Sequence, residues 1–416
     1  MRILVVCQHY WPEPYYLSEV CEELVRRGHE VHVVTDVPNY PMGEIYADYR
    51  RGRNREQERN GVRITRTFTI GRRHGAFFRL LNYYSYSFSS TLYVKRLSGD
   101  YDVVFANQTS PVMMTRAATA YSRKWGKKCV LYCMDLWPAC LSAGGLRPTN
   151  PIYRFFGRVS RRLYNRADRI LITSKMFREY LETEHGIPDE KIEYLPQFAS
   201  DVFDRLPQAE EKDSVDIVFA GNIGAAQSLG TLLRAAKLLE NQSCGGKPLR
   251  WHIVGDGSEL ENLKALSAEL ALTNVIFYGR RPAEEMPAFC AMADAMAVLL
   301  TADADISRTL PGKVQACMAA GRPIVAAANG ETARVLEEAA CGFCAPAEDS
   351  AGFAEAVRAF LAEEDKPLLG RRARYFYEDH FEKRIFMDKL EKELMSYESA
   401  DDKRRVRDTE HGAYMH

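Results

Sequence analysis

The chain has 416 residues, more than one hydrophobic core usually serves, so we expect two domains. Hydrophobic residues make up 46% of it and charged residues 27%, which is typical of a folded soluble protein. Lys and Arg together number 56, as do Asp and Glu, so no net charge attracts a polyanion, and no nucleic-acid partner is expected.

The sequence contains no apolar run of the roughly 20 residues that span a bilayer, and no secretory signal precedes the first predicted strand, so an integral membrane protein is not expected. The ten cysteines lie mostly inside apolar runs, and we interpret them as reduced core residues of a cytosolic protein. Cys341-Gly342-Phe343-Cys344 is formally a CxxC motif, but its setting is not thioredoxin-like, so no redox role is predicted.

The first half of the chain alternates predicted strands and helices. Ser18 is expected to cap a helix that continues through Arg27 and ends at Gly28, and a further helix is expected at Val112–Trp125. The strands of this half are predicted at Ile3–Cys7, Glu30–Thr35, Val62–Phe68, Val103–Ala106, Cys129–Met134 and Arg169–Thr173. This alternation predicts a parallel sheet that is covered by helices on both faces.

A segment with two prolines and several charges interrupts the pattern before a second alternating series begins. The strands of that series are predicted at Val215–Ala220, Trp251–Val254, Val275–Tyr278, Ala295–Leu300 and Pro323–Ala327, and its helices at Leu229–Leu239, Glu259–Ala271, Ala283–Ala291, Val314–Ala320 and Ala333–Ala340. The predicted organisation is a domain at 1–200, a linker at 201–214, a second domain at 215–374, a helix at 375–398 and a tail at 399–416. Ligands of such doubly wound sheets bind at the carboxyl ends of the strands, so a cleft between the two sets of strand ends is the expected site.

The second series includes Thr309-Leu310-Pro311-Gly312-Lys313, directly before a predicted helix. Pro311 suits the first helical turn, and Gly312 lets an anion approach the backbone. Lys313 adds its charge to the positive end of the helix dipole. The turn therefore predicts a diphosphate site, although an ordinary capped helix has the same pattern.

Several motifs occur in an order that resembles one family. They are Arg27-Gly28-His29-Glu30-Val31, Val37-Pro38-Asn39-Tyr40-Pro41, Asp135-Leu136-Trp137-Pro138, Phe219-Ala220-Gly221-Asn222-Ile223-Gly224, Val254-Gly255-Asp256-Gly257, and Pro311-Gly312-Lys313 through Ala319-Ala320-Gly321-Arg322-Pro323-Ile324. From Met1 to about Leu394, the chain resembles the family-four retaining glycosyltransferases. The resemblance implies the α/β GT-B fold, with two Rossmann-like domains facing a cleft and a C-terminal helix that returns to the first domain. The second and third motifs are most similar to the bacterial polysaccharide branch, which includes fucosamine-type amino-sugar transferases.

The chain departs from the family pattern at several positions. Arg308 and Ala316 stand where the family commonly has two glutamates near the donor. Asn222 and Gln227 stand near the usual arginine and lysine, and Met134 replaces a histidine. Tyr15 and Tyr16 replace a glycine pair in the first loop, and we expect both on the acceptor side.

The resemblance implies a UDP-sugar as donor, with no further cofactor. No tightly bound metal is expected, because the cleft motifs supply a cation and a helix dipole but no clustered carboxylates or histidines. Lys313 and Gly312 are predicted to hold the diphosphate, assisted by Gln227 and Asn222 as neutral donors, and the turn at Gly255 is expected at the same site. Arg280 and Arg281 could lie near the base, or they could form a solvated loop. Glu331 could hold sugar hydroxyls, or it could be a plain glutamate at a helix N-terminus. These candidates are Asn222, Gln227, Gly255, Arg280, Arg281, Gly312, Lys313 and Glu331.

Asp135 is the best candidate for orienting or deprotonating the acceptor hydroxyl, because it directly follows a predicted strand of the first domain. The alternative is that its side chain braces the turn at Leu136-Trp137-Pro138. No protein nucleophile is expected, since front-face departure and attack is the usual proposal for enzymes of this kind.

Basic and aromatic residues interleave from Arg72 to Arg96, and Phe77, Phe78 and Arg79 lie within this stretch. Interleaving of this kind suits an interfacial helix on anionic lipid, although a core helix with a charged outer face is the alternative. We therefore expect a cytoplasmic protein that is peripheral at the inner face of the plasma membrane and uses a polyprenyl-linked saccharide as acceptor.

The sequence thus predicts a retaining glycosyltransferase that moves a hexose or an N-acetylhexosamine from a UDP-sugar to a lipid-linked saccharide in bacterial surface polysaccharide synthesis. Two alternatives stay open. One is a nucleotide-sugar epimerase with the same two-sheet architecture. The other is an inactive GT-B subunit that binds a partner transferase, which Arg308 and Ala316 would explain.

Overall fold

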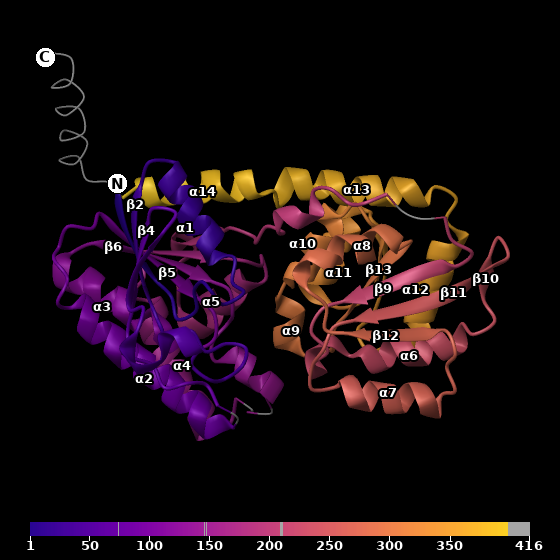
Figure 1. Ribbon diagram of the computed structural model, residues 1–416, viewed down its shortest axis with the longest axis horizontal. Helices are drawn as coiled ribbons and strands as arrows, with labels where there is room; N and C mark the ends of the chain where they lie inside the picture. Colours follow the sequence, from indigo (N-terminus) through magenta and orange to yellow (C-terminus); the bar gives the residue numbers. More distant parts are fainter. Residues whose placement is uncertain (74, 145, 147, 209–210, 398–416) are drawn as a thin grey trace, which may run out of the picture. The chain divides into compact units, whose positions relative to one another are not determined.

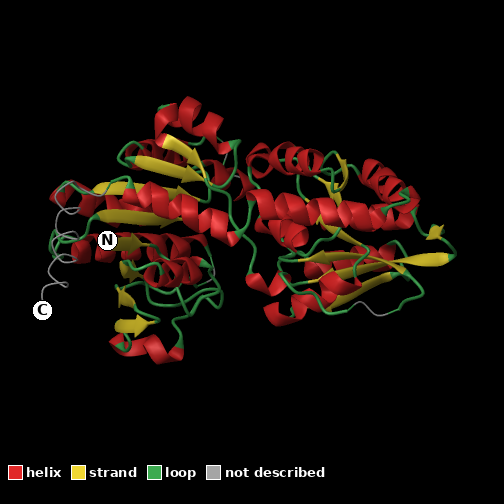
Figure 2. Ribbon diagram, turned by 90° about the horizontal axis from the view of Figure 1, so that it is seen from above, coloured by secondary structure: helices red, strands yellow, loops and turns green. Residues whose placement is uncertain are grey.

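The computed structural model describes residues 1–397 except 74, 145, 147, 209 and 210, so the predicted tail at 399–416 lies outside the described residues. The chain divides into two compact units. Unit 1 comprises Met1–Thr173, Phe177–Leu195 and the segment from Met387, and unit 2 comprises Ser174–Met176 and Pro196–Phe386. In each unit, helices flank a sheet of mainly parallel strands (Figures 1 and 2).

The sheet of unit 1 has eight strands in the order β3-β4-β2-β1-β5-β6-β7-β8, and only β3 is antiparallel to its neighbour. The strands are β1 (Arg2–Val6), β2 (Glu30–Thr35), β3 (Glu56–Arg59), β4 (Val62–Arg66), β5 (Val103–Gln108), β6 (Lys128–Cys133), β7 (Arg169–Ile172) and β8 (Ile192–Tyr194). Val5 pairs with Val33 on one side and with Phe105 on the other. The central strands are buried, which explains why they read as continuous apolar runs.

The helices of unit 1 connect these strands. They are α1 (Leu17–Arg26), α2 (Ala76–Val94), α3 (Arg116–Trp125), α4 (Pro151–Tyr164) and α5 (Phe177–His185), with shorter 3-10 segments at Ala47–Gly52, Val112–Thr115, Ala139–Gly144 and Asp189–Lys191. Val104 and Ala106 of β5 share a buried cluster with Ala117 and Tyr121 of α3. Ser18 does not cap α1 as predicted, because Tyr16 is the N-cap residue and the Ser18 hydroxyl donates to the Tyr15 carbonyl.

Unit 2 contains a seven-stranded sheet in which β9 and β11 are central. The strands are β9 (Val215–Ala220), β10 (Ser243–Cys244), β11 (Lys247–Val254), β12 (Val275–Gly279), β13 (Ala295–Leu299), β14 (Ile324–Ala327) and β15 (Gly342–Ala345). Their order is β10-β11-β9-β13-β14-β15, and β12 also pairs with β11. All pairings are parallel except that of β10 with β11.

The helices of unit 2 cover both faces of this sheet. They are α6 (Leu229–Leu238), α7 (Leu260–Glu269), α8 (Met286–Met292), α9 (Ala304–Arg308), α10 (Gly312–Ala319), α11 (Gly330–Ala339), α12 (Ser350–Ala362) and α13 (Lys366–His380), with 3-10 segments at Asp201–Phe203, Ala225–Gln227 and Ala283–Glu285. On one face, Trp251 of β11 packs with Phe353 of α12. On the other, Val298 of β13 packs with Val314 of α10 and Val335 of α11.

The last helix, α14 (Lys383–Met395), begins in unit 2 and ends in unit 1. Its Glu391 accepts hydrogen bonds from Arg27 at 2.7 Å and from His29 at 2.8 Å, which ties the helix to the first domain as the sequence predicted. A single helix at 375–398 was predicted, but α13 ends at His380 before α14 begins. The break occurs because Phe381 turns into the core of unit 2.

The CxxC motif proves to be part of a strand. Cys344 lies in β15, Cys341 is buried just before it, and both thiols are free. A Cβ atom on Gly342 would lie 1.8 Å from the Ile324 carbonyl oxygen, so glycine is required for β15 to pair closely with β14. None of the helices formed by the described residues is long and apolar enough to cross a membrane.

Candidate functional site

Three turns meet at the carboxyl ends of β9, β11 and β12 in unit 2. The Gly221 amide donates to Val254 at 3.0 Å, and the Gly255 amide donates to Gly279 at 2.9 Å. Gly255 has a φ of 145°, and a Cβ atom there would lie 1.8 Å from the Gly221 carbonyl oxygen. Only glycine therefore allows these turns to approach so closely, which explains the Gly-Asp-Gly motif.

Lys313 is the central cation of this region. It lies in the first turn of α10, where Pro311 is the N-cap residue and not, as predicted, part of the first helical turn. Its Nζ donates to Gln227 Oε1 and lies 4.1 Å from the centroid of the Phe219 ring. Among the residues that the structure describes, no carboxylate forms an ion pair with Lys313. Burial lowers the pKa of the ammonium to about 8, so the site holds a poorly solvated positive charge that an anion would stabilise.

The remaining residues predicted for the diphosphate lie around these turns. Gly312 begins α10 and is exposed. Asn222 is exposed in the turn after β9, and a Cβ atom on Gly224 would lie 2.7 Å from its Nδ2. The structure therefore brings Gln227 into contact with Lys313, whereas Asn222 folds over its own turn.

Arg280 and Arg281 follow β12, and each forms a long, exposed ion pair with a described residue. Arg280 Nε lies 3.6 Å from Asp256 Oδ2, and Arg281 Nη1 lies 3.8 Å from Glu285 Oε2. Exposed pairs of this kind contribute little to stability. Both guanidinium groups are therefore exposed to solvent, and that of Arg280 lies beside Asp256 in the Gly255 turn.

Glu331, at the start of α11, is fully buried. Its Oε1 accepts hydrogen bonds from Arg334 at 2.7 Å and from the Lys175 amide at 3.2 Å. Ser174 reaches the same region, since its hydroxyl donates to the Arg308 carbonyl. Sequence reasoning missed Ser174 and Lys175, and their position directly after a predicted strand was the only signal. The carboxylate of Glu331 already has internal partners in this arrangement.

Asp135 follows β6 at the carboxyl edge of the sheet in unit 1 and is half-buried. Burial raises the pKa of its carboxyl to about 6, against the opposing effect of a hydrogen bond from the Ser110 amide. The Trp137 amide donates to the Tyr164 hydroxyl at 3.2 Å. The turn after Asp135 is therefore braced by Tyr164, which leaves the Asp135 carboxylate as a base of near-neutral pKa.

Tyr15 and Tyr16 pack inward at the start of α1. The Tyr15 ring stacks on His9 with centroids 5.1 Å apart, and the Tyr16 hydroxyl donates to Met134 Sδ at 3.6 Å. Burial raises the pKa of both phenols. The two rings therefore pack against the residues around the loop after β1, and little of either ring is exposed to solvent.

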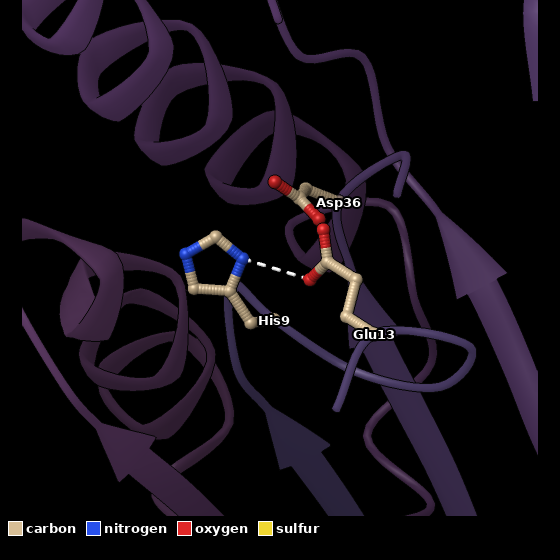
Figure 3. Close-up of side chains that lie close together, drawn as sticks. All are labelled: His9, Glu13 and Asp36. Carbon is tan, nitrogen blue, oxygen red and sulfur yellow. Dashed lines mark hydrogen bonds and ion pairs between the residues drawn. The ribbon is translucent and has the colours of Figure 1, made fainter. Parts of the chain in front are cut away.

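A buried cluster of His9, Glu13 and Asp36 joins the loops after β1 and β2, as Figure 3 shows. Glu13 Oε2 bonds to His9 Nδ1 at 2.9 Å, and Glu13 Oε1 accepts from the Asn39 and Tyr40 amides at 2.7 and 2.6 Å. Burial and the neighbouring Glu13 raise the pKa of Asp36 well above its usual value. Sequence reasoning noted the Pro-Asn-Tyr-Pro motif but not the Glu13 that holds it.

Potential ligand atoms of these three residues lie within 4.8 Å of one another, a spacing that could hold a metal ion. However, three N–H donors already surround Glu13, and a cation would have to displace or repel them. The chemistry of the cluster therefore fits an internal hydrogen-bonded anchor better than a metal site.

Helix α2 has an unusual distribution of side chains, because its exposed face is apolar. The exposed fractions are 68% for Phe77, 43% for Leu80, 39% for Tyr84, 59% for Phe88 and 42% for Leu92. These five residues, which we call the α2 stripe, recur every three or four positions and so share one face. The buried residues of α2 are mostly small and polar: Asn82, Ser87, Ser90 and Thr91, together with Tyr86 and Val94.

The alternative of a core helix with a charged outer face is therefore wrong for α2. Of the residues predicted to touch a membrane, Phe77 and Arg79 are exposed and Phe78 is half-buried against Phe77, with ring centroids 5.8 Å apart. A contiguous exposed apolar stripe marks an interaction surface.

Comparison with known families gives two adjoining matches. Residues 14–197 match the glycosyl transferase 4-like domain, and residues 214–363 match the glycosyl transferases group 1. The "Probable glycosyltransferase WbjE" of Pseudomonas aeruginosa is 24% identical over 302 residues, which cover 70% of this chain and 73% of the relative. The "Putative colanic acid biosynthesis glycosyl transferase WcaI" of Escherichia coli K12 is 25% identical over 359 residues, which cover 80% and 84%.

Solved structures show the same fold. Sucrose-phosphate synthase from Thermosynechococcus elongatus superposes with a TM-score of 0.74 at 14% identity, covering 95% of this chain and 99% of that one. Anabaena Alr3699/HepE in complex with UDP gives a TM-score of 0.69 at 16% identity, covering 95% and 100%. These likenesses confirm the GT-B fold that the sequence predicted.

Proposed function

We propose that the chain, which matches the glycosyl transferase 4-like domain over residues 14–197 and the glycosyl transferases group 1 over residues 214–363, is a retaining transferase that moves a hexose or an N-acetylhexosamine from a UDP-sugar to a lipid-linked saccharide. The similarity to WcaI, which is named for colanic acid biosynthesis, supports a role in bacterial surface polysaccharide synthesis. The UDP complex of HepE supports uridine as the nucleoside of the donor. The Pro-Asn-Tyr-Pro and Asp-Leu-Trp-Pro motifs favour a fucosamine-type amino sugar within this class.

The observation that carries the proposal is the ammonium of Lys313 beside the glycine turns, where no carboxylate of the described residues forms an ion pair with it. Transfer leaves a UDP diphosphate whose charge must be stabilised, and fixed donors in a poorly solvated site do this best. Lys313 supplies a full charge at the start of α10, and Gln227 fixes its position. Because this cation and the helix dipole neutralise the leaving group, we propose that no metal ion or cofactor is required.

Asp135 is the group that we propose acts on the acceptor. A carboxyl with a pKa near 6 is ionised at neutral pH yet can still accept a proton, which is the property that a general base needs. The hydrogen bond from Gln108 Nε2 to the Asp135 carbonyl, at 2.7 Å, fixes the backbone beneath it. Asp135 would thus orient and deprotonate the acceptor hydroxyl, with no covalent enzyme intermediate.

The α2 stripe is the surface that we propose meets the inner face of the plasma membrane. Arg79, Lys95 and Arg96 flank or interrupt it and are exposed. Apolar rings among headgroups together with arginines near lipid phosphates give reversible attachment. A cytoplasmic enzyme held in this way would reach a polyprenyl-linked saccharide without leaving the surface.

Incubation with a panel of UDP-sugars in EDTA, with and without membrane extract, tests this function. Sugar transfer to the lipid fraction is the expected result. Conversion of the sugar nucleotide without an acceptor would instead show an epimerase. UDP binding without turnover would favour an inactive subunit, the reading suggested by Arg308 and Ala316 at the usual glutamate positions. In the structure, Arg308 pairs with Asp305 at 2.6 Å.

A further inference from the structure

Residues of α2, α3 and α4 of unit 1, and of the turns that follow α2 and α4, line an open cavity of about 420 Å³ that is strongly cationic. We call it the cationic cavity. Its charged lining residues are Lys95, Arg116, Arg123, Lys124, Arg162 and Arg166. None of its described lining residues is acidic, and within the described part of the chain none of the six forms an ion pair. Burial and the nearby charges of Arg162, Arg123 and Arg116 lower the pKa of Arg166.

Gathering six positive charges without a counter-charge is unfavourable for folding. The usual partner of clustered arginines is phosphate, since the guanidinium fork matches phosphate oxygens. The arrangement therefore points to a phosphate-bearing ligand that is absent from the folded chain itself.

An apolar cavity of about 270 Å³ adjoins the cationic one and shares Arg116, Arg162 and Arg166 with it. Its other lining residues are Tyr84, Ser87, Met113, Phe155, Val159 and Leu163. Tyr84 also belongs to the α2 stripe, so this apolar surface continues onto the face proposed to meet the membrane. A phosphate site with an adjoining apolar site matches an amphiphile.

We propose that the two cavities together bind one anionic phospholipid, with its phosphate headgroup in the cationic cavity and the start of an acyl chain in the apolar cavity. The proposal deepens the membrane attachment described above and rests on it. The ligand is a lipid of the bilayer and is distinct from the reacting saccharide.

The direction of the helices supports this choice over the acceptor lipid. Helices α2, α3 and α4 each precede a parallel strand, so all three run from the carboxyl edge of the sheet to its amino edge. Phe155 precedes Arg162 on α4, and Arg116 precedes Arg123 on α3, so the apolar cavity lies nearer the edge that carries Asp135. An acceptor with its sugar at Asp135 would place its phosphate before its hydrocarbon chain, which is the reverse order.

Calorimetry with soluble dihexanoyl phosphatidic acid on the full chain tests the proposal, with dihexanoyl phosphatidylcholine as the neutral reference. The variant Arg162→Gln/Arg166→Gln removes two charges from the cavity. The variant Arg154→Gln/Arg158→Gln removes two charges from α4 outside both cavities and is the matched control. Each basic group near a lipid phosphate contributes a factor of about five, so the cavity variant should bind roughly 25-fold more weakly. The control variant should bind as wild type does.

Absence of phosphatidic acid binding by the wild type, or equal losses in both variants, would overturn the assignment. Inorganic pyrophosphate binding as tightly as phosphatidic acid would show a free-anion site, and stronger displacement by farnesyl diphosphate would show an acceptor site. Either result also contradicts the proposal. If the first variant unfolds, Arg123→Gln/Lys124→Gln provides the same comparison. UDP titration of each variant separates this result from the proposed transfer, because UDP binding should be unchanged in all of them.

Discussion

Replacement of Lys313 by alanine tests the donor site directly. The ammonium has Gln227 and the Phe219 ring as its contacts and no carboxylate in the described structure, so it is available to a diphosphate. A hydrogen bond to a charged group contributes about 1.5–3 kcal/mol, and its loss should weaken UDP binding by roughly 10- to 150-fold. Isothermal titration calorimetry measures this change. Lys264→Ala is the matched control, because Lys264 is an exposed lysine of unit 2 that pairs with Glu261 at 2.8 Å.

The pH dependence provides a second readout on the same residue. Because the pKa of Lys313 is lowered to about 8 from its usual 10.5, UDP affinity should fall as pH rises through about 8. A lowered lysine pKa also means that the folded state binds fewer protons than the unfolded state between those values. The unfolding free energy should therefore rise with pH across this window, and the full cost of burying the charge is present below it. Lys313→Met should accordingly be no less stable than the wild type at pH 7.

Two results would refute this reasoning. Unchanged UDP affinity in Lys313→Ala would show that the diphosphate binds elsewhere. An unaltered fall in affinity near pH 8 in that variant would show that another group causes the titration. A lower unfolding free energy of Lys313→Met at pH 7 would contradict the inferred cost of burying the charge. It would not bear on the diphosphate site, which the UDP titrations test.

Three further outcomes are expected. Asp135→Asn should lower kcat by about 10²–10⁴-fold with UDP affinity unchanged, and wild-type turnover should increase as pH rises through about 6, since the ionised carboxylate is the active form. A variant with Phe77→Ser and Phe88→Ser should sediment less with anionic vesicles. Its unfolding free energy should stay within about 0.5 kcal/mol of the wild-type value, because both rings are exposed. Glu13→Gln should lower the unfolding free energy by about 1–3 kcal/mol, whereas Asp36→Asn should be nearly neutral and should remove the loss of stability that rising pH causes through the raised pKa of Asp36. Urea unfolding at about pH 5 and at about pH 8 tests the Glu13 and Asp36 substitutions. Equal effects of the two substitutions on the unfolding free energy would contradict this expectation.

The fold was predictable from the sequence because both sheets are mainly parallel and buried. Strands β2 and β9 have the predicted bounds, since each is a mainly apolar run followed directly by a turn residue, Asp36 or Gly221. Strand β15 was missed because Gly342 and Cys344 give a weak strand pattern, and its pairing depends on the space that Gly342 leaves beside Ile324. The break after α13 was missed because local periodicity continues through it, while Phe381 is drawn into a core formed by distant residues.

The candidate site was predictable only where it is local. Lys313 and its glycine follow one another in the chain, so their pattern is visible in a single turn. The hydrogen bonds from the Asn39 and Tyr40 amides to Glu13 join positions far apart in sequence, and neither local sequence predicts this contact. A hydrogen bond of this kind is created by the pairing of β1 with β2, and so it becomes visible only with the sheet in place.

Helix α2 shows the same limit in a form that bears on function. Its periodicity reveals that one face differs from the other, but periodicity does not state which face turns inward. Here Ser87, Ser90 and Thr91 turn inward, and their small side chains allow α3 to pack closely. Hydroxyls such as Ser90 Oγ, which donates to the Tyr86 carbonyl at 2.6 Å, are satisfied within the helix and need no water. The large rings are consequently left outside. Lys95 then ends the helix and enters the cationic cavity, so a single surface of unit 1 would present the apolar stripe and the phosphate site to the same bilayer.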